Sequence, residues 1–339
     1  MGLWKKVTGI IKDKNSIVWA NFSGKSSFRN PDLETSIIKA TSHDEYHIDK
    51  RNAQIVFSWI RASPISLRPL VWALSRRMEK TRSWVVAVKG LMLMHGVFYC
   101  KVPAVEKMGR LPFDLSSFTD GDTTSGKTWG FNAFVREYYA FLDQRALVLS
   151  EKDNRKADDR SPMAQQLSKL QKLQSLLDML LQVKPRAENM KLPLILEAMD
   201  CIIIEIYDVY SRICAEITKV LLNIYSVKKP EAATALKVLQ KAMTQGEELS
   251  SFFDSCKEFG VMNANEFPTV AQIPKEEVEE LERIENDETA AIVEHKEALK
   301  TVITDKWVLF DENLKINEEK NNKNFSFAEE TAALIEYVP

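Results

Sequence analysis

The stretch Trp84–Cys100, WVVAVKGLMLMHGVFYC, is the most apolar segment of the chain. A helix that spans a bilayer needs about 20 consecutive apolar residues. This segment is shorter, and Lys89 and His95 interrupt it. The stretch therefore predicts a helix buried in the core of a folded domain rather than a membrane anchor.

The segments around this helix also show helical periodicity, and no sustained alternation of the strand type is found. The sequence NPD at residues 30–32 is typical of a helix start, because a capping side chain precedes a proline and an acid. The apolar face of that helix would consist of Leu33, Ile37 and Ile38. The next helix carries Ile55, Val56, Trp59 and Ile60 on one face. The whole pattern predicts an all-α protein.

Further helical segments follow at residues 129–150, 190–226 and 230–258. Between them a stripe of leucines recurs every three or four residues: Leu167, Leu170, Leu173, Leu177 and Leu180. The stripe is too short for a stable coiled coil, which favours core packing. A succession of short helices joined by short loops predicts a helical solenoid or bundle.

The chain of 339 residues is long enough for one large domain with an appendage, or for two domains. Its net charge of −2 points to no class of partner, and we expect no nucleic-acid partner. The four cysteines are far apart, and no signal peptide opens the chain, which is typical of a reducing cytosol. The cysteines are Cys100, Cys201, Cys214 and Cys256.

Composition divides the chain into three parts. Residues 1–30 are basic and amphipathic, residues 31–265 carry the helical patterns, and residues 266–339 form an acidic helix and a tail. The acidic helix is expected at residues 275–288, which hold eight acids against two bases. The last stretch has too few apolar groups to fold alone.

The first fourteen residues have the pattern of a helix that lies at a membrane surface. Their apolar face consists of Leu3, Trp4, Val7, Ile10 and Ile11, and the bases on the other faces are Lys5, Lys6, Lys12 and Lys14. Gly9 lowers the helix propensity, so order could arise only on binding. The pattern of this segment fits a membrane-binding helix and a helix that caps the bundle's own core equally well.

The segment GDTTSGKT, residues 121–128, matches the phosphate-loop pattern of nucleotide-binding proteins. That motif needs a buried strand before its first glycine, and the preceding GRLPFDLSSFTD has a proline and no β-branched run. A nucleotide-binding protein is the alternative function, and a purely structural helical scaffold is the third.

The segment HDEYH, residues 43–47, resembles the histidine spacing of a zinc protease. Catalytic zinc needs a third protein ligand, and the other histidines, His95 and His295, are remote in sequence. We therefore expect neither a metal nor another cofactor.

The same loop also suggests a pocket for phosphate. Lys39 lies near the end of one helix, while Lys50 and Arg51 begin the next, whose free N–H groups would face an anion. The acids Asp44, Glu45 and Asp49 cancel these charges, so an ordinary solvated loop is the other interpretation.

Three blocks of the sequence resemble the ANTH domain of the clathrin assembly proteins, particularly the plant members. The blocks are PDLETSIIKATSHDE from Pro31, SWVVAVKGLMLMHGVF from Ser83 and FNAFVREYYAFLDQRAL from Phe131. The resemblance covers about residues 1 to 265 and implies a helical solenoid that binds phosphatidylinositol 4,5-bisphosphate and helps build clathrin coats. The resemblance implies that the protein is not an enzyme. It also implies a peripheral membrane location, at coated pits and vesicles of the plasma membrane or the Golgi.

The resemblance also implies a head-group site. Lys39 matches the family's first lysine, and Arg51 is a basic replacement in its cluster of two lysines and a histidine. Asp49 and Asn52 stand where the family has a lysine and the histidine. Lys50 and His43 would compensate in part, so the expected head-group ligands are Lys39, His43, Lys50 and Arg51.

Two partners besides lipid follow from the resemblance. Leu222 and Met243 would line a groove for vesicle SNAREs. Clathrin or other coat adaptors would bind the tail, although it has no NPF, DPF or DLL triplet, and WVLFD at residues 307–311 only loosely resembles a clathrin box.

Overall fold

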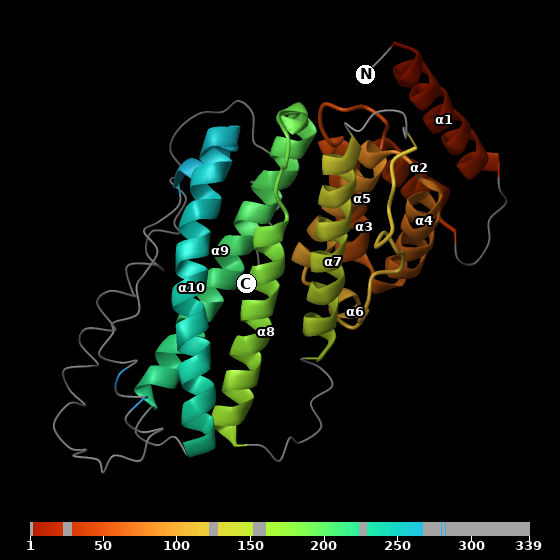
Figure 1. The fold of residues 1–339 in the computed structure, drawn as a ribbon. Coiled ribbons are helices and arrows are strands. Elements are labelled where there is room, and N and C mark those ends of the chain that lie inside the picture. Colours follow the sequence, from red (N-terminus) through yellow and green to blue (C-terminus); the bar gives the residue numbers. More distant parts are fainter. Residues whose placement is uncertain are drawn as a thin grey trace, which may run out of the picture.

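The fold is taken from a computed structural model, which describes residues 3–22, 29–121, 128–151, 161–223 and 229–266, and the single residues 279 and 282. Over these ranges the chain forms α-helices and short 3-10 helices, with no strand (Figure 1). The prediction of an all-α protein is confirmed.

The α-helices are α1 (Leu3–Phe22), α2 (Pro31–Ala40), α3 (Lys50–Ala62), α4 (Leu67–Lys80), α5 (Trp84–Tyr99), α6 (Pro103–Glu106), α7 (Trp129–Glu151), α8 (Pro162–Gln182), α9 (Pro193–Leu222) and α10 (Lys229–Phe259). The 3-10 helices are η1 (Pro64–Ser66), η3 (Glu188–Met190) and η5 (Met262–Glu266). Helices α2 to α5 gather at one end, and the long helices α8 to α10 pack side by side at the other (Figure 1). Helix α1 lies along the outer side of the first group (Figure 1).

Helix α5 is the central core helix, as its composition predicts. Every side chain from Trp84 to Tyr99 is buried. The first N–H groups of a helix have no partner within the helix. At the start of α5, the Asp120 carboxylate supplies one by accepting the Trp84 N–H at 2.8 Å. Asn30 likewise accepts the N–H groups of Asp32 and Leu33, which confirms the helix start expected there.

The other predicted helices occur with ends shifted by a few residues. The leucine stripe of α8 is buried throughout, which confirms that it packs into the core. The predicted face of α3 is wrong in part, since Ile55 and Trp59 are each more than one third exposed. The core face of α3 is instead formed by Ala53, Val56, Phe57 and Ile60, at three- and four-residue spacing.

A buried polar cluster joins the two ends of the domain. Glu205 on α9 accepts from His95 at 3.0 Å and Tyr99 at 2.6 Å on α5, and from Arg145 on α7 at 2.6 Å. Burial raises the pKa of Glu205, but Arg145 and His95 lower it further, so the net pKa lies far below its usual value. The carboxylate stays ionised, and its three partners fix the positions of three helices.

The expected acidic helix, the tail and WVLFD fall outside the described residues, apart from the single positions 279 and 282. The division into three parts therefore stays a prediction. No helix in the described ranges combines the length and the apolar composition that crossing a bilayer requires.

Candidate functional site

Asp13 links helix α1 to the rest of the domain through hydrogen bonds. Asp13 accepts the backbone N–H of His43 at 2.9 Å, the His43 Nδ1–H at 2.9 Å and Arg77 Nη2–H at 2.6 Å. Arg77 also donates to the carbonyl and hydroxyl oxygens of Thr41, at 2.8 and 3.2 Å. The acid therefore connects α1 both to the α2–α3 loop and to α4.

Gly9 allows α1 to approach this closely. A Cβ atom at Gly9 would lie 2.7 Å from the Cβ of His43, closer than two such atoms pack. The face of α1 toward the domain consists of Gly9, Asp13, Ser16, Ile17 and Ala20, at helical spacing. The expectation that Gly9 leaves this segment without order until it binds is wrong, because α1 is a docked helix here.

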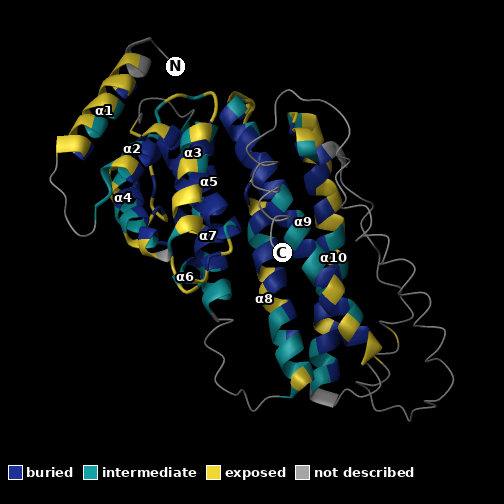
Figure 2. Cartoon of the chain, turned by 180° about the vertical axis from the view of Figure 1, so that it is seen from behind, coloured by how far each residue is buried: buried dark blue, intermediate teal, exposed yellow. Residues whose placement is uncertain are grey.

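The opposite face of α1 is exposed, as Figure 2 shows, and it carries a row of apolar residues beside Lys14. The exposed fractions are 46% for Val7, 55% for Ile10, 52% for Ile11, 51% for Val18 and 83% for Phe22. We call these five residues the apolar stripe. The alternative in which the apolar face caps the bundle's core is wrong for Val7, Ile10 and Ile11. The side chains of Leu3, Trp4, Lys5 and Lys6 lie outside the described residues.

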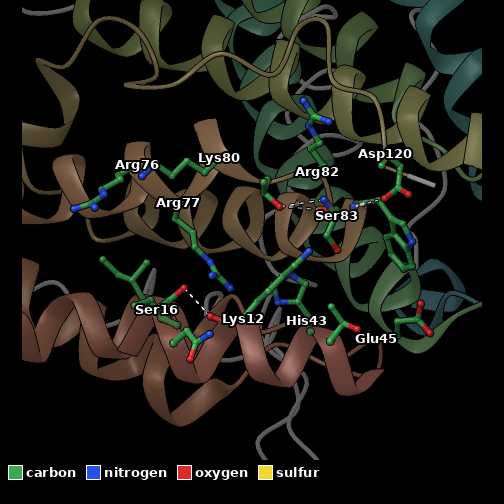
Figure 3. A pocket seen from close by; sticks show the side chains of 18 of the residues that line it. Lys12, Ser16, His43, Glu45, Arg76, Arg77, Lys80, Arg82, Ser83 and Asp120 are labelled. Carbon is green, nitrogen blue, oxygen red and sulfur yellow. Dashed lines mark hydrogen bonds between the residues drawn. The ribbon is translucent and has the colours of Figure 1, made fainter. Parts of the chain in front are cut away.

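A groove of about 1340 Å³ runs between α1 and the domain (Figure 3). Its α1 wall consists of Thr8, Gly9, Lys12, Asn15, Ser16 and Trp19. Its facing wall includes Arg76, Arg77 and Lys80 of α4, followed by Arg82 and Ser83. Figure 3 shows the basic side chains of α4 on one side and Lys12 on the other. We call this cavity the basic groove.

The groove carries an excess of positive charge. Six lysine and arginine side chains line it against the three carboxylates of Glu34, Glu45 and Asp120. Arg29 pairs with Glu34 at 2.7 Å, and Arg77 pairs with Asp13. Within the described ranges, the other four cations have no carboxylate partner: Lys12, Arg76, Lys80 and Arg82. Such a set of cations can bind an anion with several phosphate groups.

The groove borders the apolar stripe. Thr8, Lys12, Asn15 and Trp19 follow one another at three- and four-residue spacing, and this row is turned by roughly 100° from the apolar stripe around α1. A bilayer that buried the apolar stripe would therefore bring its head groups near the α1 wall of the groove.

The residues expected to hold a head group are only partly brought together. His43 lines the groove, whereas Lys39, Lys50 and Arg51 do not. Lys39 is exposed near the end of α2, and Lys50 and Arg51 lie in the first turn of α3. His43 is already bonded to Asp13.

The N-terminus of α3 was expected to offer free N–H groups to an anion, and this is wrong in part. The Asp49 carboxylate caps the helix by accepting the Asn52 N–H at 3.0 Å. The Asn52 side-chain amide donates to the same carboxylate at 2.6 Å. Both departures from the family pattern therefore form one cap, which places a negative charge beside Lys50 and Arg51.

Lys89 adds a buried cation close to this loop. Its side chain is fully buried, and its ammonium donates to Ser42 at 3.2 Å. Burial lowers the pKa of Lys89 to about 8, while the charges of Asp44, Glu197 and other nearby acids act in the opposite direction. Lys89 therefore stays largely protonated at neutral pH and adds positive potential beside Ser42 in the α2–α3 loop.

The phosphate-loop match at residues 121–128 and the zinc-like match at residues 43–47 lack the structural context that each motif requires. The residues before Gly121 form loops and turns rather than a strand, and residues 122–127 lie outside the described part. His43 and His47 belong to the α2–α3 loop, where His47 lies 3.4 Å from Glu197. Among the described residues, no group of three or more His, Cys, Asp or Glu is arranged to hold a metal.

The two residues expected to contact a SNARE lie on α9 and α10. Leu222 is the last residue of α9 and is 49% exposed. Met243 lies within α10 and packs partly buried against the core. Their proposed role stays a prediction.

The sequence interpretation missed most of the basic groove. The segment RRMEKTR at residues 76–82 holds four bases and one acid across the end of α4 and the following loop. A count of charge in short windows would have marked this run. Its position opposite Lys12 could not be deduced, because that depends on how α1 docks.

Comparison with known proteins agrees with the resemblance of the sequence blocks. The model of the ANTH domain family matches residues 32–287. One protein of Arabidopsis thaliana named "Putative clathrin assembly protein" is 48% identical over 92% of this chain and 88% of its own length. A second protein of that name and organism is 46% identical over 94% of this chain and 90% of its own length. The Arabidopsis "Clathrin coat assembly protein AP180" is 26% identical over 84% of this chain and 50% of its own length. The chain therefore belongs to the ANTH-domain family.

Proposed function

We propose that this chain is a clathrin-coat adaptor that reaches the membrane by two adjacent surfaces. The basic groove binds the phosphorylated head group of a phosphoinositide, and the apolar stripe of α1 enters the interface of the same bilayer. The observation that carries the proposal is that these two surfaces share one helix, with Lys12 on the groove side and Ile10 and Ile11 on the stripe.

The charge of the groove supports the head-group part of the proposal. A basic residue near an anionic membrane contributes about 1 kcal/mol to binding, so Lys12, Arg76, Lys80 and Arg82 together supply about 4 kcal/mol. Phosphatidylinositol 4,5-bisphosphate presents two phosphomonoesters, whose high charge suits a cluster of cations better than a single lysine does. Lys39, Lys50 and Arg51 remain a second candidate contact for anionic lipid.

The names of the relatives support the coat-assembly part. Proteins similar to this chain over most of its length are named for clathrin assembly. We infer the same role here, at coated pits and vesicles on the cytoplasmic side of the plasma membrane. Clathrin or another coat adaptor would be the protein partner.

A vesicle SNARE is the proposed cargo, through Leu222 and Met243. The half-exposed Leu222 at the end of α9 offers an apolar contact that a helical partner could cover. Leu222→Ser should weaken the binding of a SNARE helix without affecting vesicle binding.

Vesicle sedimentation tests the lipid part. The protein is mixed with vesicles of phosphatidylcholine alone, with added phosphatidylserine, or with added phosphatidylinositol 4,5-bisphosphate. The groove variant Arg76→Glu/Lys80→Glu/Arg82→Glu should lose most of its binding to the phosphoinositide vesicles.

The control carries the same charge change at the far end of the domain. Lys172→Glu/Lys237→Glu/Lys257→Glu alters exposed lysines of α8 and α10. If both variants lose binding equally, net charge rather than the groove determines membrane affinity, and the proposed site is wrong. If wild type binds none of the three vesicles, the adaptor proposal fails.

A further inference from the structure

Asp13 is an acid that lies against a basic groove. Its side chain is 14% exposed, and it pairs with Arg77, which lines the groove together with His43. Burial raises the pKa of Asp13, but the hydrogen bonds from His43 and Arg77 lower it further, to below its usual value. The carboxylate is therefore charged at neutral pH.

Three donors of different kinds converge on this carboxylate. They are a main-chain N–H, the imidazole Nδ1–H of His43 and the guanidinium of Arg77, at 2.6 to 2.9 Å. The Arg77 side chain is held in place by Thr41, so it keeps its position without Asp13. Guanidinium and main-chain N–H groups bind phosphate oxygens as readily as carboxylate oxygens.

We propose that the His43 and Arg77 donors form an anion subsite of the groove, that Asp13 is its internal ligand, and that a phosphomonoester displaces Asp13 from it. This inference rests on the proposed function, since the displacing group is the phosphorylated head group. It adds that binding of the head group and docking of α1 compete for the same donors.

The charges favour this exchange. A phosphomonoester carries about −1.5 to −2 at neutral pH, against −1 for a carboxylate. The groove also offers Lys80 and Arg82, which Asp13 does not contact in the structure. Displacement removes the polar link between α1 and the α2–α3 loop. The apolar stripe then becomes free to reorient in the bilayer.

Binding of soluble inositol 1,4,5-trisphosphate by calorimetry tests the subsite. Asp13→Asn removes the competing charge and keeps the shape of the side chain. It should bind at least about tenfold more tightly than wild type, the factor that one charge-assisted hydrogen bond represents.

Asp44→Asn is the matched control, because it removes one negative charge at an exposed position of the α2–α3 loop, where no hydrogen bond joins it to His43 or Arg77. It should change the affinity by less than about twofold, as expected of an exposed charge. Equal affinities for Asp13→Asn and Asp44→Asn would overturn the inference while the proposed function stands. If wild type and both variants bind no ligand, both fail.

Hydrogen exchange of α1 gives a second readout. Displacement predicts faster exchange of the α1 amides when the ligand binds to wild type, and a smaller ligand effect in Asp13→Asn. Slower exchange in wild type would instead mean that the ligand ties α1 to α4, and would overturn the inference.

Vesicles with phosphatidylinositol 4,5-bisphosphate separate the two sources of the phosphomonoester. If Asp13→Asn binds more tightly than wild type on vesicles as well, the ligand is the lipid head group. If it does so only in solution, the ligand is a free inositol phosphate, which counts against the proposed function.

Discussion

The apolar stripe of α1 should contribute measurably to membrane affinity, and Ile10→Ser/Ile11→Ser tests this. The two side chains are 55% and 52% exposed, so about half of each remains for a bilayer to bury. Full burial of an isoleucine side chain contributes about 1.5 to 3 kcal/mol, and half of that for two residues gives about 2 kcal/mol. A loss of about 2 kcal/mol corresponds to a partition coefficient about 30-fold lower.

The assay is the partition of protein onto vesicles containing phosphatidylinositol 4,5-bisphosphate, titrated over lipid concentration. The fold should be retained, because both isoleucines point away from the domain, and circular dichroism and thermal melting check this. The control is Ile55→Ser/Ile65→Ser, which makes the same chemical change at exposed positions outside α1, on α3 and η1.

Wild-type affinity in the α1 variant would refute the reasoning, because the stripe would then lie outside the bilayer. Equal losses in the α1 variant and its control would also refute it, since they would show that exposed isoleucines anywhere on the surface promote binding. The expected result is a large loss for Ile10→Ser/Ile11→Ser and little change for the control.

Three further predictions concern stability and docking. Lys89→Met should raise the free energy of unfolding by about 3 kcal/mol at pH 7, because burial lowers the pKa of Lys89 to about 8 from its usual 10.5. Because the pKa is lower in the folded state, the gain in stability is full below pH 8 and fades toward pH 10.5. Denaturant melts of wild type and variant at pH 7 and pH 10 measure this gain, and an equal gain at both pH values would contradict the prediction. Glu205→Gln should lower the unfolding free energy by about 3 to 5 kcal/mol, because the buried Arg145 loses its ionic partner, and a change below about 1 kcal/mol would contradict this. Gly9→Ala raises helix propensity but places a Cβ against His43, so hydrogen exchange of α1 should become faster, and slower exchange would show that the close approach is not needed.

The fold could be predicted in most respects because local signals agree with the packing. The apolar run at Trp84 predicts a helix buried on all sides, Pro31 marks a helix start, and the leucine stripe identifies the buried face of α8. The face of α3 was misassigned because Ile55 and Trp59 are apolar yet lie toward solvent. Hydrophobicity alone does not tell an apolar residue on the surface from one in the core.

The candidate site was harder to predict because it is assembled from distant segments. Lys12 and Lys80 line the same groove because α1 docks on the domain, with Asp13 bonded to His43 and Arg77. The sequence also cannot reveal that a carboxylate of the chain itself already accepts a hydrogen bond from an expected ligand-binding group. Asp13 accepts the ring N–H of His43, and Asp49 accepts a main-chain N–H at the start of α3.

The most direct test of the basic groove is a crystal structure of the protein with inositol 1,4,5-trisphosphate. We predict that the phosphates lie in the basic groove against α4 and the loop that follows it, within hydrogen-bond distance of Lys80 and Arg82. Phosphates bound at Lys39, Lys50 and Arg51, with the groove unoccupied, would contradict the account.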